Sequence, residues 1–163
     1  MTERHSLLVS RTIRAPLRFV YDWCTDYRES DPKVIFGSKS KRKMLVKNKD
    51  RVIYVQNYAS RDKPTSAVEV ITLHPPNIWH LDSIVVSLTG SRVIGVESYE
   101  VGEYILTSLG PRKTKLVMKF MENYEISKAP TKADDVALTH RVWDKIVPAL
   151  ENDYARKTKR HES

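Results

Sequence analysis

The sequence predicts an α+β fold with one seven-stranded antiparallel sheet, two short helices after the first strand and a long helix at the end. Three observations favour this class. Apolar residues alternate with polar ones over most of residues 38–126, which is the strand period. Near both ends of the chain, apolar residues recur at helical spacing instead. The links between the strand segments are too short to contain crossover helices. The 163 residues suit one domain, 1–163.

The first strand is expected at 6–14 and leads directly into a helical region. Ala15-Pro16 opens the first helix, where a proline costs nothing because the first helical N–H has no partner. Asp31-Pro32 is expected to end the region, after a second short helix. The apolar positions of the first helix are Leu17, Val20, Tyr21 and Cys24.

Six further strands follow, separated by turn-forming residues such as Pro75-Pro76-Asn77 and Gly110-Pro111. Their expected bounds are 38–48, 51–60, 66–74, 79–88, 97–109 and 113–126. The short links predict hairpins between neighbours in the chain.

A long helix is expected over 131–160. Thr131 caps its start, with Asp134 three residues later in a variant of the capping box. Pro148 removes one main-chain hydrogen bond and predicts a bend. The expected inward stripe is Val136, His140, Trp143, Val147, Leu150 and Tyr154.

Charge and cysteine content narrow the class of protein. The chain carries 28 Lys and Arg against 20 Asp and Glu, a formal net charge of +8. Cys24 is its only cysteine, which excludes an internal disulfide and suits a reducing cytoplasm, where we expect the protein to lie. No apolar run exceeds four residues, so no membrane-spanning helix is predicted. The first residues carry no apolar signal segment.

Three stretches carry a resemblance to a known superfamily. Residues 9–16 end in Ala15-Pro16 and run into the segment 19–27, which ends in Asp26-Tyr27; residues 104–116 form a last hairpin through Pro111; the long helix follows. This order resembles the helix-grip superfamily, which includes birch-pollen-allergen-like proteins, steroidogenic-regulatory lipid-transfer (START) domains and the polyketide cyclase/dehydrase family.

The resemblance implies a curved sheet that wraps around the long helix, with a cavity between them. Typical ligands of the superfamily are lipids, sterols, flavonoids, quinones or polyketides, and most members bind or carry while a minority catalyse. The pollen-allergen branch has a glycine-rich loop that the turn 47–51 lacks, so no phosphate-binding role is transferred.

Candidate cavity residues come from strand alternation and from the helical stripe. Leu116, Met118 and Phe120 share one strand face, and continued alternation adds Glu122 and Tyr124. Tyrosine suits a pocket for a flat, partly oxygenated ligand, because it combines apolar surface with a hydroxyl group. The full set is Tyr54, Tyr58, Tyr104, Leu106, Leu116, Met118, Phe120, Glu122, Tyr124, His140, Trp143 and Val147.

Glu122 and His140 are the catalytic candidates if the protein is an enzyme, as an acid/base pair. Each also has a structural interpretation. Glu122 lies in solvent if its strand frays before it, and His140 is a satisfied core residue if it only packs.

A basic segment forms a second candidate site. Lys39, Lys41, Lys43 and Lys47 alternate and should form an outward stripe. Such a stripe can dock an anionic membrane surface or nucleic acid, and it can equally protect an exposed strand from pairing. The absence of interleaved aromatic residues argues against nucleic acid.

No metal or cofactor is predicted. His80 and Asp82 share a strand face, but His74 is separated from them by two prolines, and zinc needs three or four converging donors. Cys24 has Asp22 and Asp26 nearby, which would raise its thiol pKa, so a packing role is expected. No nucleotide-binding or hydrolase motif occurs.

Three functions therefore remain open at this level. The first is binding or transport of a hydrophobic small molecule or lipid without catalysis. The second is a cyclase or dehydratase of polyketide type, a lyase that uses Glu122 or His140. The third is an interaction module that docks anionic lipid or nucleic acid through the basic strand. The oligomeric state follows from none of these patterns.

Overall fold

One antiparallel sheet and three helices make up the computed structural model, which describes residues 3–37, 39–58, 65–126 and 129–160. The sheet order is β1-β7-β6-β5-β4-β3-β2, so the first strand pairs with the last and the others follow as hairpins. The elements are β1 (Glu3–Ile13), α1 (Leu17–Thr25), α2 (Asp31–Phe36), β2 (Lys41–Lys47), β3 (Arg51–Tyr58), β4 (Thr65–His74), β5 (Ile78–Thr89), β6 (Arg92–Gly110), β7 (Lys113–Tyr124) and α3 (Lys132–Lys159). The predicted fold class is confirmed.

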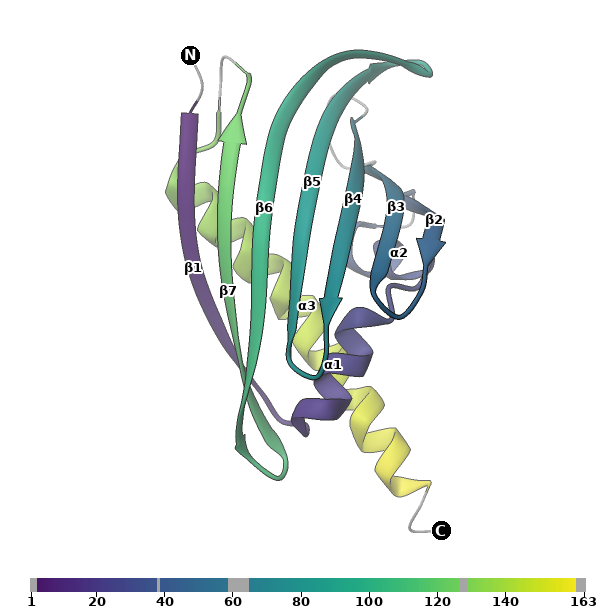
Figure 1. Cartoon of the computed structure of the whole chain (residues 1–163), viewed down its shortest axis with the longest axis vertical. Helices are drawn as coiled ribbons and strands as arrows, with labels where there is room; N and C mark the ends of the chain where they lie inside the picture. The colour runs from purple at the N-terminus through teal and green to yellow at the C-terminus, as the bar shows by residue number, and fades with distance from the viewer. Residues whose placement is uncertain (1–2, 38, 59–64, 127–128, 161–163) are drawn as a thin grey trace.

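The sheet curves, and all three helices lie on its concave side (Figure 1). The long α3 runs obliquely behind the strands and contacts β1, while α1 and α2 sit beside it. The convex face of the sheet carries no helix in the described part of the chain. In most of the strands one face is therefore buried and the other faces solvent, which is why their residues alternate in the sequence; the edge strand β2 has no fully buried residue.

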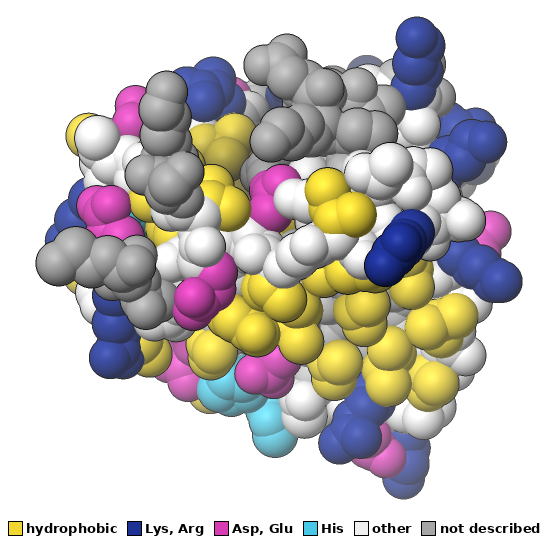
Figure 2. Space-filling view, turned by 90° about the horizontal axis from the view of Figure 1, so that it is seen from above, with side chains coloured by type: hydrophobic (Ala, Val, Ile, Leu, Met, Phe, Trp, Pro, Cys, Tyr) yellow, Lys and Arg dark blue, Asp and Glu magenta, His cyan; other side chains and the backbone are white. Residues whose placement is uncertain are grey.

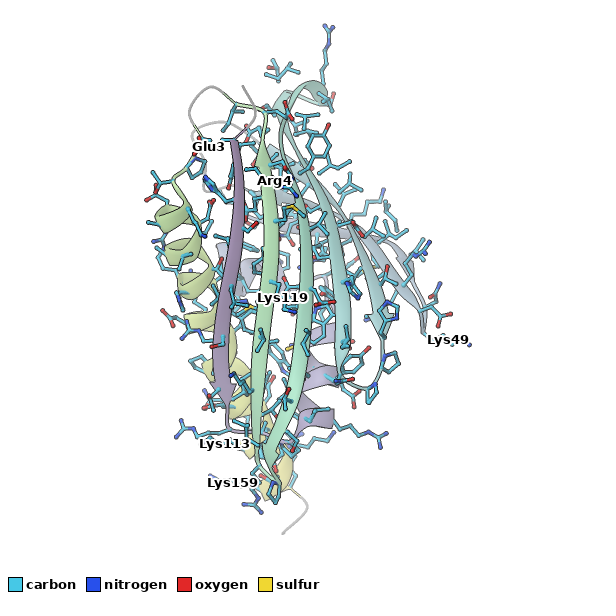
Figure 3. The ribbon with its side chains drawn as sticks, turned by 60° about the vertical axis from the view of Figure 1, so that its left-hand side comes forward. Glu3, Arg4, Lys49, Lys113, Lys119 and Lys159 are labelled. Atoms are coloured by element: carbon cyan, nitrogen blue, oxygen red, sulfur yellow. The ribbon has the colours of Figure 1, made fainter. Side chains whose placement is uncertain are left out.

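Strand β7 shows this alternation most clearly. Leu116 and Met118 are fully buried, whereas Lys113 and Lys119 are exposed and point away from the sheet (Figure 3). The strand keeps its pairing with β1 and β6 as far as Tyr124. The alternation therefore holds at Glu122, which lies on the concave side, and the interpretation that the strand frays before Glu122 is wrong.

The apolar core lies between the lower half of the sheet and the helices. Trp79 from β5 packs edge-on against Tyr21 of α1, and Leu150 of α3 is completely buried. The residues with no measurable exposure that build it are Ile13, Ala15, Val20, Leu116, Met118 and Leu150.

Two local expectations are wrong. Asp31-Pro32 starts α2 instead of ending the helical region, because proline fits the first helical positions. A β-bulge between Met44 and Val46 moves Lys47 to the concave side, opposite the buried Val52. Lys47 therefore leaves the predicted outward stripe.

The start of α3 is fixed by a capping box and by a buried acid. Thr131 and Asp134 exchange both bonds of the capping box, as predicted. The next residue, Asp135, is 3% exposed and accepts a bond from Tyr124 on β7. The helix continues through Pro148 to Lys159.

None of the described helices has the length and apolar content to cross a membrane.

Exposed hydrophobic side chains occupy part of the outer surface. Val68, Ile84 and Tyr99 are opposite one another on β4, β5 and β6, and each is at least 40% exposed. Seen from above, hydrophobic side chains gather in one broad group, with Lys and Arg around its margin (Figure 2).

His5 fastens β1 to the start of α3. Its Nδ1 lies 2.5 Å from Asp135 Oδ2 and its Nε2 lies 3.0 Å from Glu3 Oε1, while Tyr124 and Glu122 flank it on β7. Both contacts are favourable when both ring nitrogens carry protons, and the two carboxylates raise the pKa of His5 above 6.5.

We predict that His5→Gln lowers the free energy of unfolding by about 1–3 kcal/mol, as expected for hydrogen bonds to charged groups. Because the folded pKa is raised, this stability is complete below pH 6.5 and is lost as the pH rises through the folded pKa. Denaturant titrations of both proteins across this range measure the difference. The exposed His74→Gln is the control, and a gap that is independent of pH would contradict the assignment.

Candidate functional site

A cavity of about 480 Å³ lies between the concave face of the sheet and the three helices. Its walls come from β2 to β7 and from α1, α2 and α3. This volume falls in the range of sites that enclose a small organic molecule.

One side of the cavity is an aromatic wall. Trp79 and Tyr104 stack with ring centres 4.8 Å apart and planes 7° apart, and Phe120 meets Tyr104 edge-on at 5.3 Å. Trp143 of α3 completes the wall, 6.3 Å from Tyr104. These four residues are called the aromatic wall below. Their flat faces and depth favour a flat ligand.

Gly102 lets the ring of Phe120 lie over strand β6. The two residues are directly opposite in the sheet, and a Cβ atom on Gly102 would come within 2.7 Å of Phe120 Cδ1. Any larger residue would push the ring aside, into the space that the cavity occupies.

A row of polar side chains crosses the sheet beside the aromatic wall. Each member is directly opposite the next on the neighbouring strand, so all of them point to the concave side. From β3 to β1 the members are Tyr54, Glu69, Ser83, Glu100, Glu122 and His5. All except His5 line the cavity.

Glu100 and Glu122 form the centre of this row. Burial raises the pKa of Glu100 well above its usual range, and the charges of Glu122, Glu69 and Asp135 raise it further. Among the described residues none forms a hydrogen bond with the Glu100 carboxyl group, which faces the cavity. Protonation of the Glu100–Glu122 pair, called the carboxyl pair below, is therefore favoured relative to an ordinary glutamate side chain.

A chain of hydrogen bonds connects the carboxyl pair with the edge of the sheet. Tyr124 Oη contacts both Glu122 Oε2 and, at 2.8 Å, Asp135 Oδ1. Asp135 contacts His5, and His5 contacts the exposed Glu3, which Figure 3 shows at the end of β1. Tyr124 has one proton to donate, so it donates to one of these two carboxyl groups at a time.

The other end of the row is held by tyrosines and an arginine. Glu69 accepts hydrogen bonds from the hydroxyl groups of Tyr54 and of Tyr58, the latter at 3.0 Å. The Arg42 guanidinium stacks 4.1 Å from the Tyr54 ring centre and donates to Gln56 Oε1 at 2.8 Å. Both ends of the row are thereby fixed in position.

The structure places seven of the twelve predicted binding residues in the cavity wall. These are Tyr54, Tyr58, Tyr104, Phe120, Glu122, Tyr124 and Trp143. Leu106, Leu116 and Met118 are buried in the core below the cavity. Val147 packs against the same core.

His140 does not meet Glu122. It lies half-buried outside the cavity wall, and its backbone carbonyl accepts a hydrogen bond from Arg11. Helical spacing places it one turn before Trp143, but the residues of α3 that line the cavity at this level are Thr139, Val142, Trp143 and Ile146. The predicted acid/base pair of Glu122 and His140 is therefore not formed.

Sequence reasoning missed Glu69, Glu100 and Asp135. Glu100 could have been found, because an even spacing places it on the same strand face as Tyr104, as an even spacing places Glu122 on the same face as Phe120. No local signal in the sequence shows that β1 and β7 enclose Asp135.

The remaining candidates lie outside the cavity. Lys39, Lys41 and Lys43 are exposed, while Lys47 Nζ lies 2.9 Å from Asp26 Oδ1. The rings of His74 and His80 contact each other, with centres 5.0 Å apart. Within the described ranges, no group of three or more His, Cys, Asp or Glu converges on a metal position.

Cys24 lies in the cavity wall, and its surroundings do not favour a nucleophile. Burial raises the pKa of its thiol to about 12, and Asp31 adds to the effect. A thiol with this pKa is protonated near neutral pH, which agrees with the packing role expected for it.

Comparisons with solved structures find many similar folds at low sequence identity. ZhuI aromatase/cyclase from Streptomyces sp. R1128 matches with a TM-score of 0.65, 13% identity and 96% of both chains covered. An uncharacterized protein from Rhizobium leguminosarum matches with a TM-score of 0.71 and 13% identity, over 93% of this chain and 97% of the other. Ginseng major latex-like protein 151 from Panax ginseng matches with a TM-score of 0.62 and 9% identity, over 90% and 97%.

At the level of sequence, neither a family model nor a curated protein matches this chain. Similarity at 9–13% identity, extended over nearly the whole chain, is similarity of fold. The sheet order, the two short helices after β1 and the long α3 on the concave side agree with it. The chain therefore has the helix-grip fold, as its sequence resemblance implied.

Proposed function

We propose that this protein binds a flat, largely hydrophobic small molecule in the cavity between the sheet and α3. One observation carries the proposal: the aromatic wall and the carboxyl pair face the same 480 Å³ space. The wall would hold the apolar body of the ligand, and the carboxyl pair would bind its polar group.

The aromatic wall supplies most of the binding free energy in this proposal. Removal of apolar surface from water is worth about 25 cal/mol per Å², so a three-ring ligand that buries about 200 Å² gains about 5 kcal/mol before ordering costs. The polar row has fixed positions, so a polar group on the ligand would select orientation at little entropic cost.

A second function, acid–base catalysis on the bound ligand, is favoured by the carboxyl pair. Two carboxyl groups directly opposite each other, one of them with a raised pKa, can supply an acid and a base at the same pH. In this version Glu100 is the acid and Glu122 the base, and His140 has no role. Binding alone needs only the cavity, so it stands as the first proposal.

The basic strand supports a docking function less well. Lys47 is paired with Asp26 on the concave side, which leaves Lys39, Lys41 and Lys43 exposed beside the edge strand β2. Lysines on an edge strand also prevent pairing with another sheet, which accounts for them without a partner.

We predict that the neutral three-ring fluorophore 1-aminoanthracene binds in the cavity. Ser83 lies in the middle of the polar row, so Ser83→Phe fills the space and should weaken binding about tenfold or more. Fluorescence titration measures both affinities.

Ile84→Phe is the matched control, because Ile84 is the next residue on β5 and faces the convex side, 42% exposed. Its affinity for 1-aminoanthracene should equal that of the wild type. Absence of binding to the wild-type protein, or equal loss in both variants, would contradict the proposed function.

We also predict that the Glu100 carboxyl group keeps its proton well above the usual range for glutamate. Carbon-13 NMR of the side-chain carboxyl group follows its titration directly. Glu122→Gln removes one of the charges that raise this pKa and should shift the midpoint down, while burial keeps it above 4.5. A Glu100 midpoint in the normal range would remove the basis for acid–base catalysis and leave the binding proposal intact.

A further inference from the structure

The cavity is acidic, although the whole chain has a net charge of +8. The charges that act on Glu100 are those of Glu122, Glu69 and Asp135, all of them carboxyl groups. The polar end of the cavity thus has the opposite sign to the protein as a whole.

The basic residues of the cavity wall are engaged elsewhere. Arg42 pairs with Gln56 and Asp31, and Arg28 pairs with Asp31. Lys145 of α3 donates to the backbone carbonyl of Ile35 at 3.0 Å. These contacts lie at the α2 side of the cavity. The three basic side chains therefore stabilise the cavity wall and do not neutralise the carboxyl pair.

We propose that the ligand is a hydrophobic amine, bound as its cation, with the ammonium group at Glu100 and Glu122 and its rings against the aromatic wall. This inference rests on the proposed function and names the chemical class of its ligand. It uses Glu100, the one carboxyl group among the described residues of the cavity wall that has no hydrogen bond to the protein.

An ammonium group satisfies this site better than the alternatives. It donates charge-assisted hydrogen bonds to both carboxylates, and the faces of Trp79, Tyr104 and Trp143 attract a cation. An anionic ligand would add a further negative charge to a buried cluster of them, which is costly. A neutral carbonyl group could accept only the proton that Glu100 holds.

Binding of the ammonium group is coupled to the loss of one proton from the carboxyl pair. The raised pKa of Glu100 favours a shared proton on the carboxyl pair of the unliganded protein, whereas an ammonium group favours two carboxylates, so this proton would leave to solvent when the amine binds. Amine binding should therefore release a proton and strengthen as the pH rises, as long as the amine stays protonated.

Three flat three-ring compounds of similar shape test the inference: 9-aminoacridine, which is a cation near neutral pH, acridine, which is neutral there, and acridine-9-carboxylate, which is an anion. Displacement of 1-aminoanthracene reports binding in the same cavity. We expect 9-aminoacridine to bind about tenfold or more tightly than acridine, and the carboxylate to bind most weakly. Calorimetry in buffers of different ionisation enthalpy should detect the released proton.

Glu100→Gln should reduce the preference of 9-aminoacridine over acridine and keep the affinity for acridine. Glu103→Gln is the matched control, because Glu103 lies on the same strand and faces the convex side beside Lys119. Glu122→Gln should act in the same direction as Glu100→Gln.

The outcomes separate the two proposals. Binding of all three compounds without preference for the cation, or a preference that survives Glu100→Gln, would overturn the amine inference and leave a hydrophobic binding site. Failure of all three compounds and of 1-aminoanthracene to bind would overturn the proposed function itself.

Discussion

A curved sheet of seven strands presents more inward surface than one long helix and two short ones can cover, and the rest of the structure follows from this mismatch. At the lower half, Leu116, Met118 and Leu150 fill the space and make the core. Further along the sheet, α3 stays bonded to β1 and β7 through Asp135, and the inward side chains of β3 to β7 border a cavity instead. Polar residues are tolerated there because the cavity supplies room for water or a ligand.

Most ionisable groups at this end of the sheet have a hydrogen-bond partner in the protein. Asp135 is held between His5 and Tyr124, and Glu69 lies between two tyrosine hydroxyl groups. Glu100 differs, since the described protein offers its carboxyl group no hydrogen bond. The Glu100 side chain is half-buried and borders the cavity, so the binding proposal supplies a partner for its carboxyl group from outside the protein.

The fold was predictable from the sequence because its signals are local. Alternation in β7, the Thr131 capping box and the short hairpin turns each depend on a few neighbouring residues. The site was only partly predictable, because it depends on contacts between distant segments. Three features have no signature in their own stretch of chain: the bulge that turns Lys47 inward, the position of His140 outside the cavity wall, and the enclosure of Asp135 by β1 and β7. Glu100 is different: strand alternation indicated it as clearly as Glu122.

Native mass spectrometry of the purified protein, before and after incubation with three-ring compounds and again after extraction with organic solvent, tests the central claim most directly. The account predicts one small molecule per chain, either carried through purification or taken up on incubation, and released by the solvent. A chain that keeps its unliganded mass throughout would contradict the claim that this cavity is a binding site.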